Sequence, residues 1–454
     1  GSSRAGRSPQ FGGAGMAAPP GAAKGGGDGG GGKRVAFVHL DLGIGGAEQL
    51  VVHAAVGLRR HGHHVTMFTS HHDPKRCFPP TVDGTFDVRV FGDFLPRAIC
   101  GRFHALCSLL RMLWVCLRIR LSGQRFDVIV NDQVSTVNPF LIGLCARLVF
   151  YIHFPDLLLC TERGSAFKRL YRWPLDALEE RTTTMASTLL VNSAFTADVV
   201  RTTFPSMAAM QLQVLYPPVD LHEVDAFLKD AEAKHTACDG QVCGLHAGDE
   251  AFSLDGGPFF LSLNRYERKK DVRLAILAFS ELLSKLPPGT PRPRLVVAGG
   301  HDERVRENVE YHAELVEDVR RLGFPAGAVH FLRSVPNTAR WLLLWRAAAL
   351  VYTPHREHFG MVPCEAMAVG TPVIAADSGG PRESVEDGKT GWLCQPPESP
   401  GVFAAAMRRC IDLQQADPDG FEALRARARE RMRGEFGLEA FAGRLDALVR
   451  RQGE

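Results

Sequence analysis

The chain has 454 residues, of which 45% are hydrophobic and 23% are charged, and its formal net charge is only +3. This composition is typical of a globular protein, and the length is sufficient for two domains of comparable size. A charge so near zero creates no overall field that would attract nucleic acid, so no nucleic-acid partner is expected.

The eleven cysteines are scattered along the chain and odd in number. None forms a Cys-x-x-Cys pair, and no Cys/His cluster has the spacing of zinc ligands, so no metal site is predicted. Several, such as Cys107 and Cys116, lie in apolar runs. We therefore expect free, buried thiols in a reducing compartment rather than a disulfide framework.

Residues 1–32 are mostly Gly, Ala, Pro and Ser and cannot bury enough apolar surface to fold, so this segment is expected to be disordered. From Lys33 onward, short apolar runs alternate with longer helical patterns. Such alternation predicts a parallel, doubly wound sheet in a first domain over 33–220. The expected strands of this domain are 33–40, 63–70, 126–132, 148–154, 188–193 and 213–220.

The segment 221–256 is polar and is interpreted as a linker or insertion. The strand–helix rhythm then returns in a second domain over 257–430, and the last helical stretch, 431–454, is expected to pack back on the first domain. The sequence thus predicts an α/β fold with two Rossmann-like domains facing a cleft, where ligands bind at the carboxyl ends of strands. The expected strands of the second domain are 259–264, 294–300, 328–332, 349–354, 372–377 and 391–394.

A glycine-rich turn, GIGGAE at 43–48, follows the first expected strand and begins a helix. Gly45 and Gly46 would let backbone amides approach a phosphate or a sugar, and the helix N-terminus favours an anion. The motif is not G-x-G-x-x-G and the second strand ends without an acidic residue, which disfavours dinucleotide binding. A tight turn that needs glycine only for packing is the alternative.

A basic run, NRYERKK at 264–270, also follows a strand. Arg265 with its planar fork and Lys270 as a point charge could hold a diphosphate between them. Basic runs are more often solvated surface, but the position at the carboxyl end of a strand favours a ligand site here.

Two glutamates eight residues apart mark the segment EHFGMVPCE. Glu357 would lie in the loop after the strand 349–354, and Glu365 about one turn into the next helix. Both could accept hydrogen bonds from sugar and ribose hydroxyls, although acids at the start of a helix are also favoured by its dipole alone. The backbone amides that could meet phosphates between them belong to Phe359, Gly360, Met361 and Val362.

Three further candidates follow strands. Gly379 and Gly380 open a helix and could form an amide-lined pocket or a simple turn. His153 lies at the carboxyl end of the expected strand 148–154 and would face the cleft, although a lone histidine is more often a core residue. Asp132, with Gln133, ends the strand 126–132.

Two segments have the composition of interfacial helices. The segment 104–121 is apolar with three arginines, and 168–181 mixes basic residues with Leu170, Tyr171 and Trp173. Both would suit a membrane surface with anionic head groups. For the first, a core helix with snorkelling arginines is an equal alternative. No apolar run is long enough to predict a membrane-spanning helix.

Taken together, the motifs GIGGAE, NRYERKK, EHFGMVPCE and DSGGPRES resemble, in order and spacing, those of the retaining two-domain (GT-B) glycosyltransferases. The resemblance covers nearly everything from Lys33 to about Arg450. Longer strings are similar to the eukaryotic α-1,3/1,6-mannosyltransferases of dolichol-linked oligosaccharide assembly. They are FVHLDLGIGGAEQLV, NDQVS, HFPDLLL, KRLYRWPLDALEE, VNSAFTA, LSLNRYERKKD and VAGGHDERVRENVEY.

The resemblance implies GDP-mannose as the donor, with no obligatory metal or cofactor. The implied acceptor is a dolichol-diphosphate chitobiose that bears one mannose and receives an α-1,3 and then an α-1,6 mannose. The implied place is the cytosolic face of the endoplasmic reticulum membrane, with the membrane surface and other mannosyltransferases of the same pathway as partners. The alternatives are another donor or lipid acceptor, and a catalytically idle scaffold that binds a sugar nucleotide.

The resemblance also implies roles for site residues. Arg265 and Lys270 would neutralise the donor diphosphate. Glu365 would hold the ribose and Glu357 would contact the mannose. The amides of Gly45 and Gly46 would lie near the diphosphate, and His153 beside the transferred sugar. One departure is Asp271, which stands where the family usually has Gly or Asn.

Overall fold

The computed structural model describes residues 31–99, 103–159, 166–237, 245–247, 250–254, 257–287 and 289–451. Side chains at 159, 166–172, 232–237, 245–247 and 250–251 are not described. The disorder expected for 1–32 therefore falls, except for its last two residues, outside the described residues. So do Cys100, Cys160, Cys238 and Cys243, and the side chains of Leu170 and Tyr171.

Within the described residues, the first half of the chain forms a seven-stranded parallel sheet in the order β3-β2-β1-β4-β5-β6-β7. Its strands are β1 Arg34–Leu42, β2 His64–His72, β3 Asp87–Val90, β4 Phe126–Asp132, β5 Cys145–Ile152, β6 Thr188–Val191 and β7 Leu212–Val214. Its helices are α1 Gly46–Arg60, α2 His104–Leu121, α3 Asn138–Leu141, α4 Asp156–Leu159, α5 Ala166–Thr183 and α6 Ala194–Thr203.

The second half repeats this topology in a six-stranded parallel sheet, ordered β12-β11-β10-β13-β14-β15 in the described residues. Its strands are β10 Phe259–Leu263, β11 Arg294–Gly299, β12 Val329–Arg333, β13 Ala349–Tyr352, β14 Val373–Ala376 and β15 Gly391–Cys394. Its helices are α8 Val272–Lys285, α9 Arg306–Leu322, α10 Asn337–Arg346, α11 Met361–Ala368, α12 Pro381–Ser384, α13 Pro400–Ala416 and α14 Pro418–Arg431.

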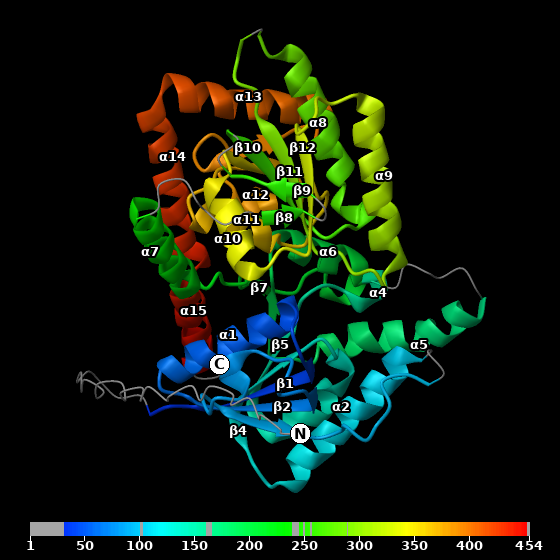
Figure 1. The fold of residues 1–454 in the computed structure, drawn as a ribbon. Helices are drawn as coiled ribbons and strands as arrows, with labels where there is room; N and C mark the ends of the chain where they lie inside the picture. The colour runs from blue at the N-terminus through cyan, green and yellow to red at the C-terminus, as the bar shows by residue number, and fades with distance from the viewer. Residues whose placement is uncertain are drawn as a thin grey trace, which may run out of the picture. The chain divides into compact units, whose positions relative to one another are not determined.

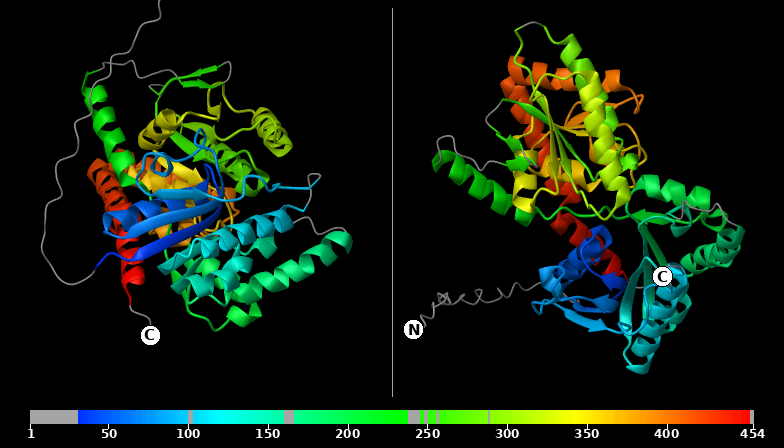
Figure 2. Two further views of the ribbon diagram at one scale, coloured as in Figure 1. Left: turned by 90° about the horizontal axis from the view of Figure 1, so that it is seen from below. Right: turned by 45° about the vertical axis from the view of Figure 1, so that its right-hand side comes forward.

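Helices cover both faces of each sheet, as parallel strands buried on two sides require (Figures 1 and 2). In the second half, α8, α9 and α13 bury apolar residues on one face, and α10 and α11 do so on the other. In the first half, α2 and α6 cover one face and α1 covers the other. The predicted α/β fold with two parallel sheets is confirmed.

Two local predictions differ from the structure. The polar segment 221–256, interpreted as a linker or insertion, contains helix α7 Leu221–Ala237 and an antiparallel hairpin of β8 Leu245–Ala247 and β9 Glu250–Phe252. The short edge strand β3 was not predicted at all. With four residues, of which Asp87 is exposed, it carries too little apolar pattern to be seen in the sequence.

The last helix, α15 Leu438–Arg450, packs against α1 of the first half (Figure 1). Its apolar face buries Phe441 and Leu445 in the core beside α1 and β1. Two polar contacts add to this packing. His63 Nε2 lies 2.6 Å from Asp446 Oδ1, and Nη2 of Arg147 donates a hydrogen bond to the carbonyl of Val449 at 3.0 Å.

The helices α1 and α15 approach each other closely at Gly57. A Cβ there would lie 2.7 Å from Ala442 Cβ. Alanine normally gains about 0.5–1 kcal/mol over glycine inside a helix, whereas an overpacked contact costs roughly 1–3 kcal/mol. We therefore expect Gly57→Ala to lower the free energy of unfolding, measured in urea, by about 1–2 kcal/mol.

A compensating change and a control make this prediction specific. Ala442→Gly in the Gly57→Ala background should recover part of the loss, with a coupling energy of roughly 0.5–3 kcal/mol. Gly443→Ala, on the same helix, meets nothing within 4 Å and should be neutral or stabilising. A Gly57→Ala variant as stable as the unmodified chain would mean that the two helices do not pack this closely.

Candidate active site

A pocket of about 370 Å³ lies where residues of both halves meet. The first half contributes the N-terminal turns of α1 and the residue after β5, and the second half contributes the loops after β10 and β13. Parallel sheets bind ligands at the carboxyl ends of their strands, and both sheets present those ends here. Its lining residues include Gly46, Gln49, His53, His153, Asn192, Asn264, Arg265, Lys270, Glu357, His358, Phe359, Gly360, Met361 and Val362.

The polar centre of the second half is an ion pair between Lys270 Nζ and Glu357 Oε2. Lys270 ends a short 3₁₀ turn after β10, and its carbonyl accepts a hydrogen bond from Thr353 Oγ1 at 3.0 Å. Glu357 follows β13. Their side chains are 13% and 22% exposed, so the pair is screened from most of the solvent yet still reaches the pocket.

Arg265 lies at the rim of the same pocket, with its side chain 67% exposed. One guanidinium nitrogen lies 3.1 Å from Glu267 Oε1. The other donors of its planar fork are thus available to a ligand in the pocket.

Asp271 adopts a left-handed backbone conformation, with φ of 42°, immediately before α8. Glycine and asparagine are the residues that enter this region most readily, and aspartate is one of the few others that does. Asp271 therefore preserves the turn that follows Lys270, although the family usually has Gly or Asn at this position. Burial raises the pKa of Asp271 above its usual value.

The loop after β13 turns sharply at Gly360, whose φ is 87°, and α11 begins at Met361. Its first two residues, Met361 and Val362, line the pocket, and the first amides of a helix have no partner within the helix itself. Behind the loop stands Tyr352, which is fully buried. Burial, followed by the nearby carboxylate of Glu357, raises the pKa of Tyr352 well above its usual value, so this hydroxyl stays protonated.

Glu365 lies one turn into α11 and forms an ion pair with Arg340 of α10. It does not line the pocket itself. The Arg340 guanidinium also lies 4.5 Å from the ring centre of Trp341. Nothing in the sequence connected Arg340 with Glu365, because the two lie on different helices.

Gly379 and Gly380 contact the loop that carries Glu357 and do not line the pocket. The amide of Gly380 donates to the Glu357 carbonyl at 2.8 Å. A Cβ at Gly380 would lie 2.2 Å from the carbonyl oxygen of Phe359, and one at Gly379 would lie 2.3 Å from that of Glu357. Both glycines therefore support the loop from behind.

At the start of α1 the two glycines have different surroundings. Gly46 lines the pocket, and a Cβ there would meet nothing within 4 Å. Gly45 has an extended backbone, and a Cβ there would lie 2.3 Å from Glu48 Oε2. Gly45 thus makes room for the Glu48 carboxylate, and Gly46 leaves the helix N-terminus open to a ligand.

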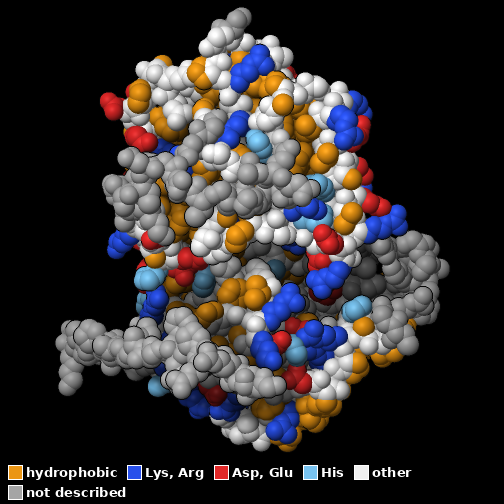
Figure 3. All heavy atoms as spheres, viewed as in Figure 1, with side chains coloured by type: hydrophobic (Ala, Val, Ile, Leu, Met, Phe, Trp, Pro, Cys, Tyr) orange, Lys and Arg blue, Asp and Glu red, His pale blue; other side chains and the backbone are white. Residues whose placement is uncertain are grey.

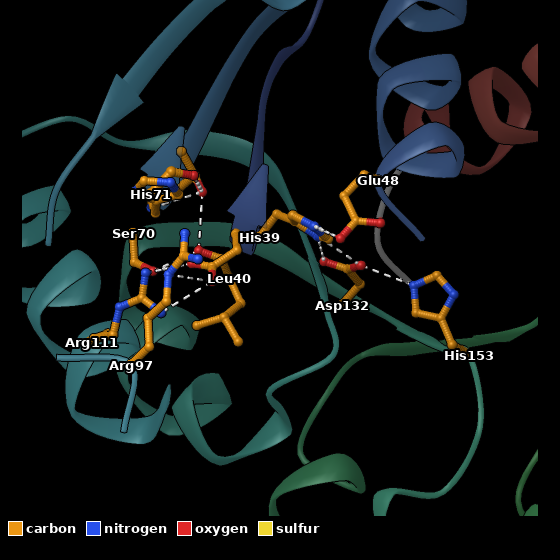
Figure 4. Close-up of polar contacts among 11 residues, drawn as sticks. His39, Leu40, Glu48, Ser70, His71, Arg97, Arg111, Asp132 and His153 are labelled. Atoms are coloured by element: carbon orange, nitrogen blue, oxygen red, sulfur yellow. Dashed lines mark hydrogen bonds and ion pairs between the residues drawn. The ribbon is translucent and has the colours of Figure 1, made fainter. Parts of the chain in front are cut away.

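His153 is held by a buried cluster shown in Figure 4. Its Nε2 lies 2.9 Å from Asp132 Oδ2, and His39 Nδ1 lies 2.8 Å from Asp132 Oδ1. His39 Nε2 is 3.9 Å from Glu48 Oε1, an ion-pair distance rather than a hydrogen bond. The sequence predicted His153 and placed Asp132 at a strand end, but it gave no sign that His39 would join them.

Several further pocket residues were missed, among them Gln49, His53, Asn192 and His358. Gln49 and His53 follow Gly46 by three and seven residues on α1, a spacing that places them on one helix face and could have identified them. The ring of His358 stacks on Phe154 with 3.6 Å between ring centres. Asn192 donates to the carbonyl of His153 at 2.9 Å.

Further hydrogen bonds join the two halves of the chain. Ser193 Oγ donates to the carbonyl of His358 at 2.6 Å. The carboxylate of Glu383 accepts hydrogen bonds from the amides of Ala194 and Phe195 at 2.7 and 2.9 Å, and so caps the N-terminus of α6.

The described part of the chain holds no group of three or more His, Cys, Asp or Glu side chains arranged for a metal ion. Nor does any described helix combine the length and apolarity needed to cross a membrane. The described cysteines are free thiols. Burial raises the pKa of four of them to about 12, which leaves them protonated and unreactive: Cys116, Cys364, Cys394 and Cys410.

Comparison with known proteins identifies the class to which the chain and its fold belong. The family described as glycosyl transferases group 1 matches residues 249–433, and Glycosyltransferase Family 4 matches residues 44–223. The structure is similar to sucrose-phosphate synthase from Thermosynechococcus elongatus, with a TM-score of 0.68 and 22% identity over 92% of this chain and 98% of that one. The protein is a two-domain glycosyltransferase of the GT-B fold, a class that uses a sugar-nucleotide donor.

The curated relatives are more specific. The alpha-1,3/1,6-mannosyltransferase ALG2 of Dictyostelium discoideum is 40% identical over 92% of this chain and 98% of its own length. That of Homo sapiens is 40% identical over 91% of this chain and 95% of its own length. The chain belongs to the alpha-1,3/1,6-mannosyltransferase family of N-glycan precursor synthesis, which confirms the resemblance found in the sequence.

Gly380 packs directly against the backbone of the loop that carries Glu357. Gly380→Ala must displace the backbone at Phe359, because the added Cβ would meet a carbonyl that cannot turn away. A shift of roughly 1 Å in a binding loop can cost on the order of 10²-fold in rate. We expect kcat/KM for the sugar-nucleotide donor to fall by about that factor.

The matched control is Gly434→Ala, where a Cβ would meet nothing within 4 Å. Its kcat/KM should be that of the unmodified enzyme. Full activity of the Gly380→Ala variant would show that the position of this loop does not matter for donor use.

Proposed function

We propose that the enzyme transfers mannose from GDP-mannose to a dolichol-diphosphate chitobiose bearing one mannose. The first transfer forms an α-1,3 bond and the second an α-1,6 bond. The observation that carries this proposal is the placement of Lys270, Glu357 and Arg265 in one pocket of a member of this family.

The charges of the pocket suit a nucleotide diphosphate. Lys270 and Arg265 would face the diphosphate oxygens, and the first amides of α11 would add the positive end of a helix dipole. In the transfer, negative charge grows on the departing GDP. A cation already in position stabilises that charge without reorganisation, and this role needs no metal ion.

Two glutamates of the second half would accept hydrogen bonds from hydroxyls of the donor. Glu357 would contact the mannose once Lys270 turns to the diphosphate, and Glu365, oriented by Arg340, would hold the ribose. The acceptor would enter from the first half, where Gln49 and His53 of α1 and His153 face the same pocket.

The test is a transfer assay with the purified full chain. Labelled GDP-mannose and, separately, UDP-sugars are incubated with the lipid-linked acceptor that bears one mannose, and the products are resolved by size. Growth by two hexoses with GDP-mannose alone supports the proposal. Transfer from a UDP-sugar would point to another donor, and nucleotide binding without any transfer would point to a scaffold.

Lys270→Ala tests the role of the pocket cation. Loss of a preorganised group that stabilises the transition state costs about 2.7–4 kcal/mol, so kcat should fall on the order of 10²–10³-fold. Lys269→Ala is the matched control, because Lys269 is exposed and pairs with Glu267. Equal turnover of the two variants would remove Lys270 from the mechanism.

We further infer that the enzyme contacts the cytosolic face of the endoplasmic reticulum membrane through α2 and α3. The residues Leu110, Leu117 and Leu121 of α2 are 48%, 43% and 70% exposed. Of these three, Leu117 lines an apolar groove of about 470 Å³ together with Phe140 of α3, and Arg120 lines the same groove. Hydrophobic side chains gather at the lower right of the face in Figure 3.

Exposed leucines beside arginine are suited to insertion among lipids with anionic head groups. The same contact would bring the enzyme near other mannosyltransferases of the pathway and near its lipid-linked acceptor. On α5, Trp173 is 73% exposed and could add an aromatic anchor.

The measurement is flotation with vesicles that contain phosphatidylserine. The double change Leu117→Glu and Leu121→Glu should reduce the bound fraction at least about ten-fold, since it places charge in the apolar contact. The control is Val305→Glu with Val309→Glu, which alters exposed apolar residues at α9. Equal binding of both variants would contradict the assignment of the membrane surface to α2.

A further inference from the structure

Asp132, which has no role in the transfer as proposed so far, lies at the centre of a buried cluster. The residue is 1% exposed and ends β4. Its carboxylate contacts two histidines at once, with His39 Nδ1 at 2.8 and 3.0 Å from its two oxygens and His153 Nε2 at 2.9 Å from Oδ2. Of these three side chains only His153 reaches the pocket.

The contact determines which atom His153 presents to a ligand. An ionised carboxylate only accepts hydrogen bonds, so Nε2 of His153 must carry a proton. The second ring nitrogen, Nδ1, is turned away from Asp132, as Figure 4 shows. In the neutral ring, Nδ1 is then a hydrogen-bond acceptor, which suits a sugar hydroxyl.

The rest of the cluster keeps Asp132 ionised. Burial alone would raise the pKa of this carboxyl. The two histidines have the larger effect, with the charge of His39 contributing most, and the pKa is lowered to about 2. Burial likewise opposes the charge on His39, yet Asp132 and then Glu48 raise its pKa from 6.5 to about 10. Around neutral pH, His39 is therefore a cation and Asp132 is an anion.

We propose that Asp132 is a positioning residue of the transfer reaction. It fixes the ring of His153 so that Nδ1 accepts a hydrogen bond from a hydroxyl of the bound sugar, and His39 with Glu48 holds Asp132 in its charged form. The proposal rests on the proposed function, because it takes the pocket to be a sugar site.

Asp132→Asn is the informative change because the amide has nearly the same shape. Its oxygen can still accept from His39, whereas its nitrogen must donate to His153 Nε2 and so moves the ring proton to Nδ1. We expect kcat to fall on the order of 10²-fold with the KM for the donor little changed. Asp127→Asn, at the other end of β4, is the control and should leave kcat unchanged.

The tautomer is read directly by NMR of the full chain with ¹⁵N-labelled histidine, with the His153 signals assigned from a His153→Gln sample. The unmodified protein should show a protonated Nε2 and an unprotonated Nδ1, and Asp132→Asn should reverse them. The measurement on the unmodified chain needs neither activity nor the variant, so it stands even if the proposed donor is wrong or the variant is unstable.

Two results would overturn the proposal. One is a proton on Nδ1 of neutral His153 in the unmodified chain. The other is an Asp132→Asn variant with the reversed tautomer and an unchanged kcat, because the orientation of His153 would then have no bearing on transfer.

Discussion

The arrangement of this site depends on the ion pair between Lys270 and Glu357. The two residues follow β10 and β13, which are neighbours in the sheet although they are far apart in the chain. The strand order reverses between them, so the connections that follow them diverge and leave a crevice. The pair crosses that crevice and keeps a cation and a carboxylate beside a pocket that a negatively charged donor can enter.

The first half repeats the same principle at its own point of reversal. There β1 and β4 are neighbours, and they bring His39 and Asp132 together as a second cation and anion. This pair is buried, whereas that of the second half is partly exposed. The difference matches the proposed roles, in which the pair of the second half meets the substrate and the pair of the first half orients His153. Burying an isolated carboxylate would be costly, and the paired histidines make it tolerable.

Much of this could be read from the sequence. The alternation of apolar runs with helical patterns predicted both sheets. The positions of Lys270, Glu357 and His153 at the carboxyl ends of expected strands predicted them as pocket residues. The pairing of Arg340 with Glu365 and the entry of His39 into the cluster could not be predicted, because they depend on which helices and strands become neighbours. Gly379 and Gly380 show another limit, since a glycine motif does not reveal whether it faces a ligand or supports a loop.

The most direct measurement is a structure of the full chain with GDP-mannose bound. We expect Lys270 Nζ and the Arg265 guanidinium to lie within about 3 Å of diphosphate oxygens. We also expect Glu357 to have left Lys270 for a mannose hydroxyl and His153 to lie beside the same sugar. A diphosphate bound away from Lys270, with the Lys270–Glu357 pair intact, would contradict this placement of the donor.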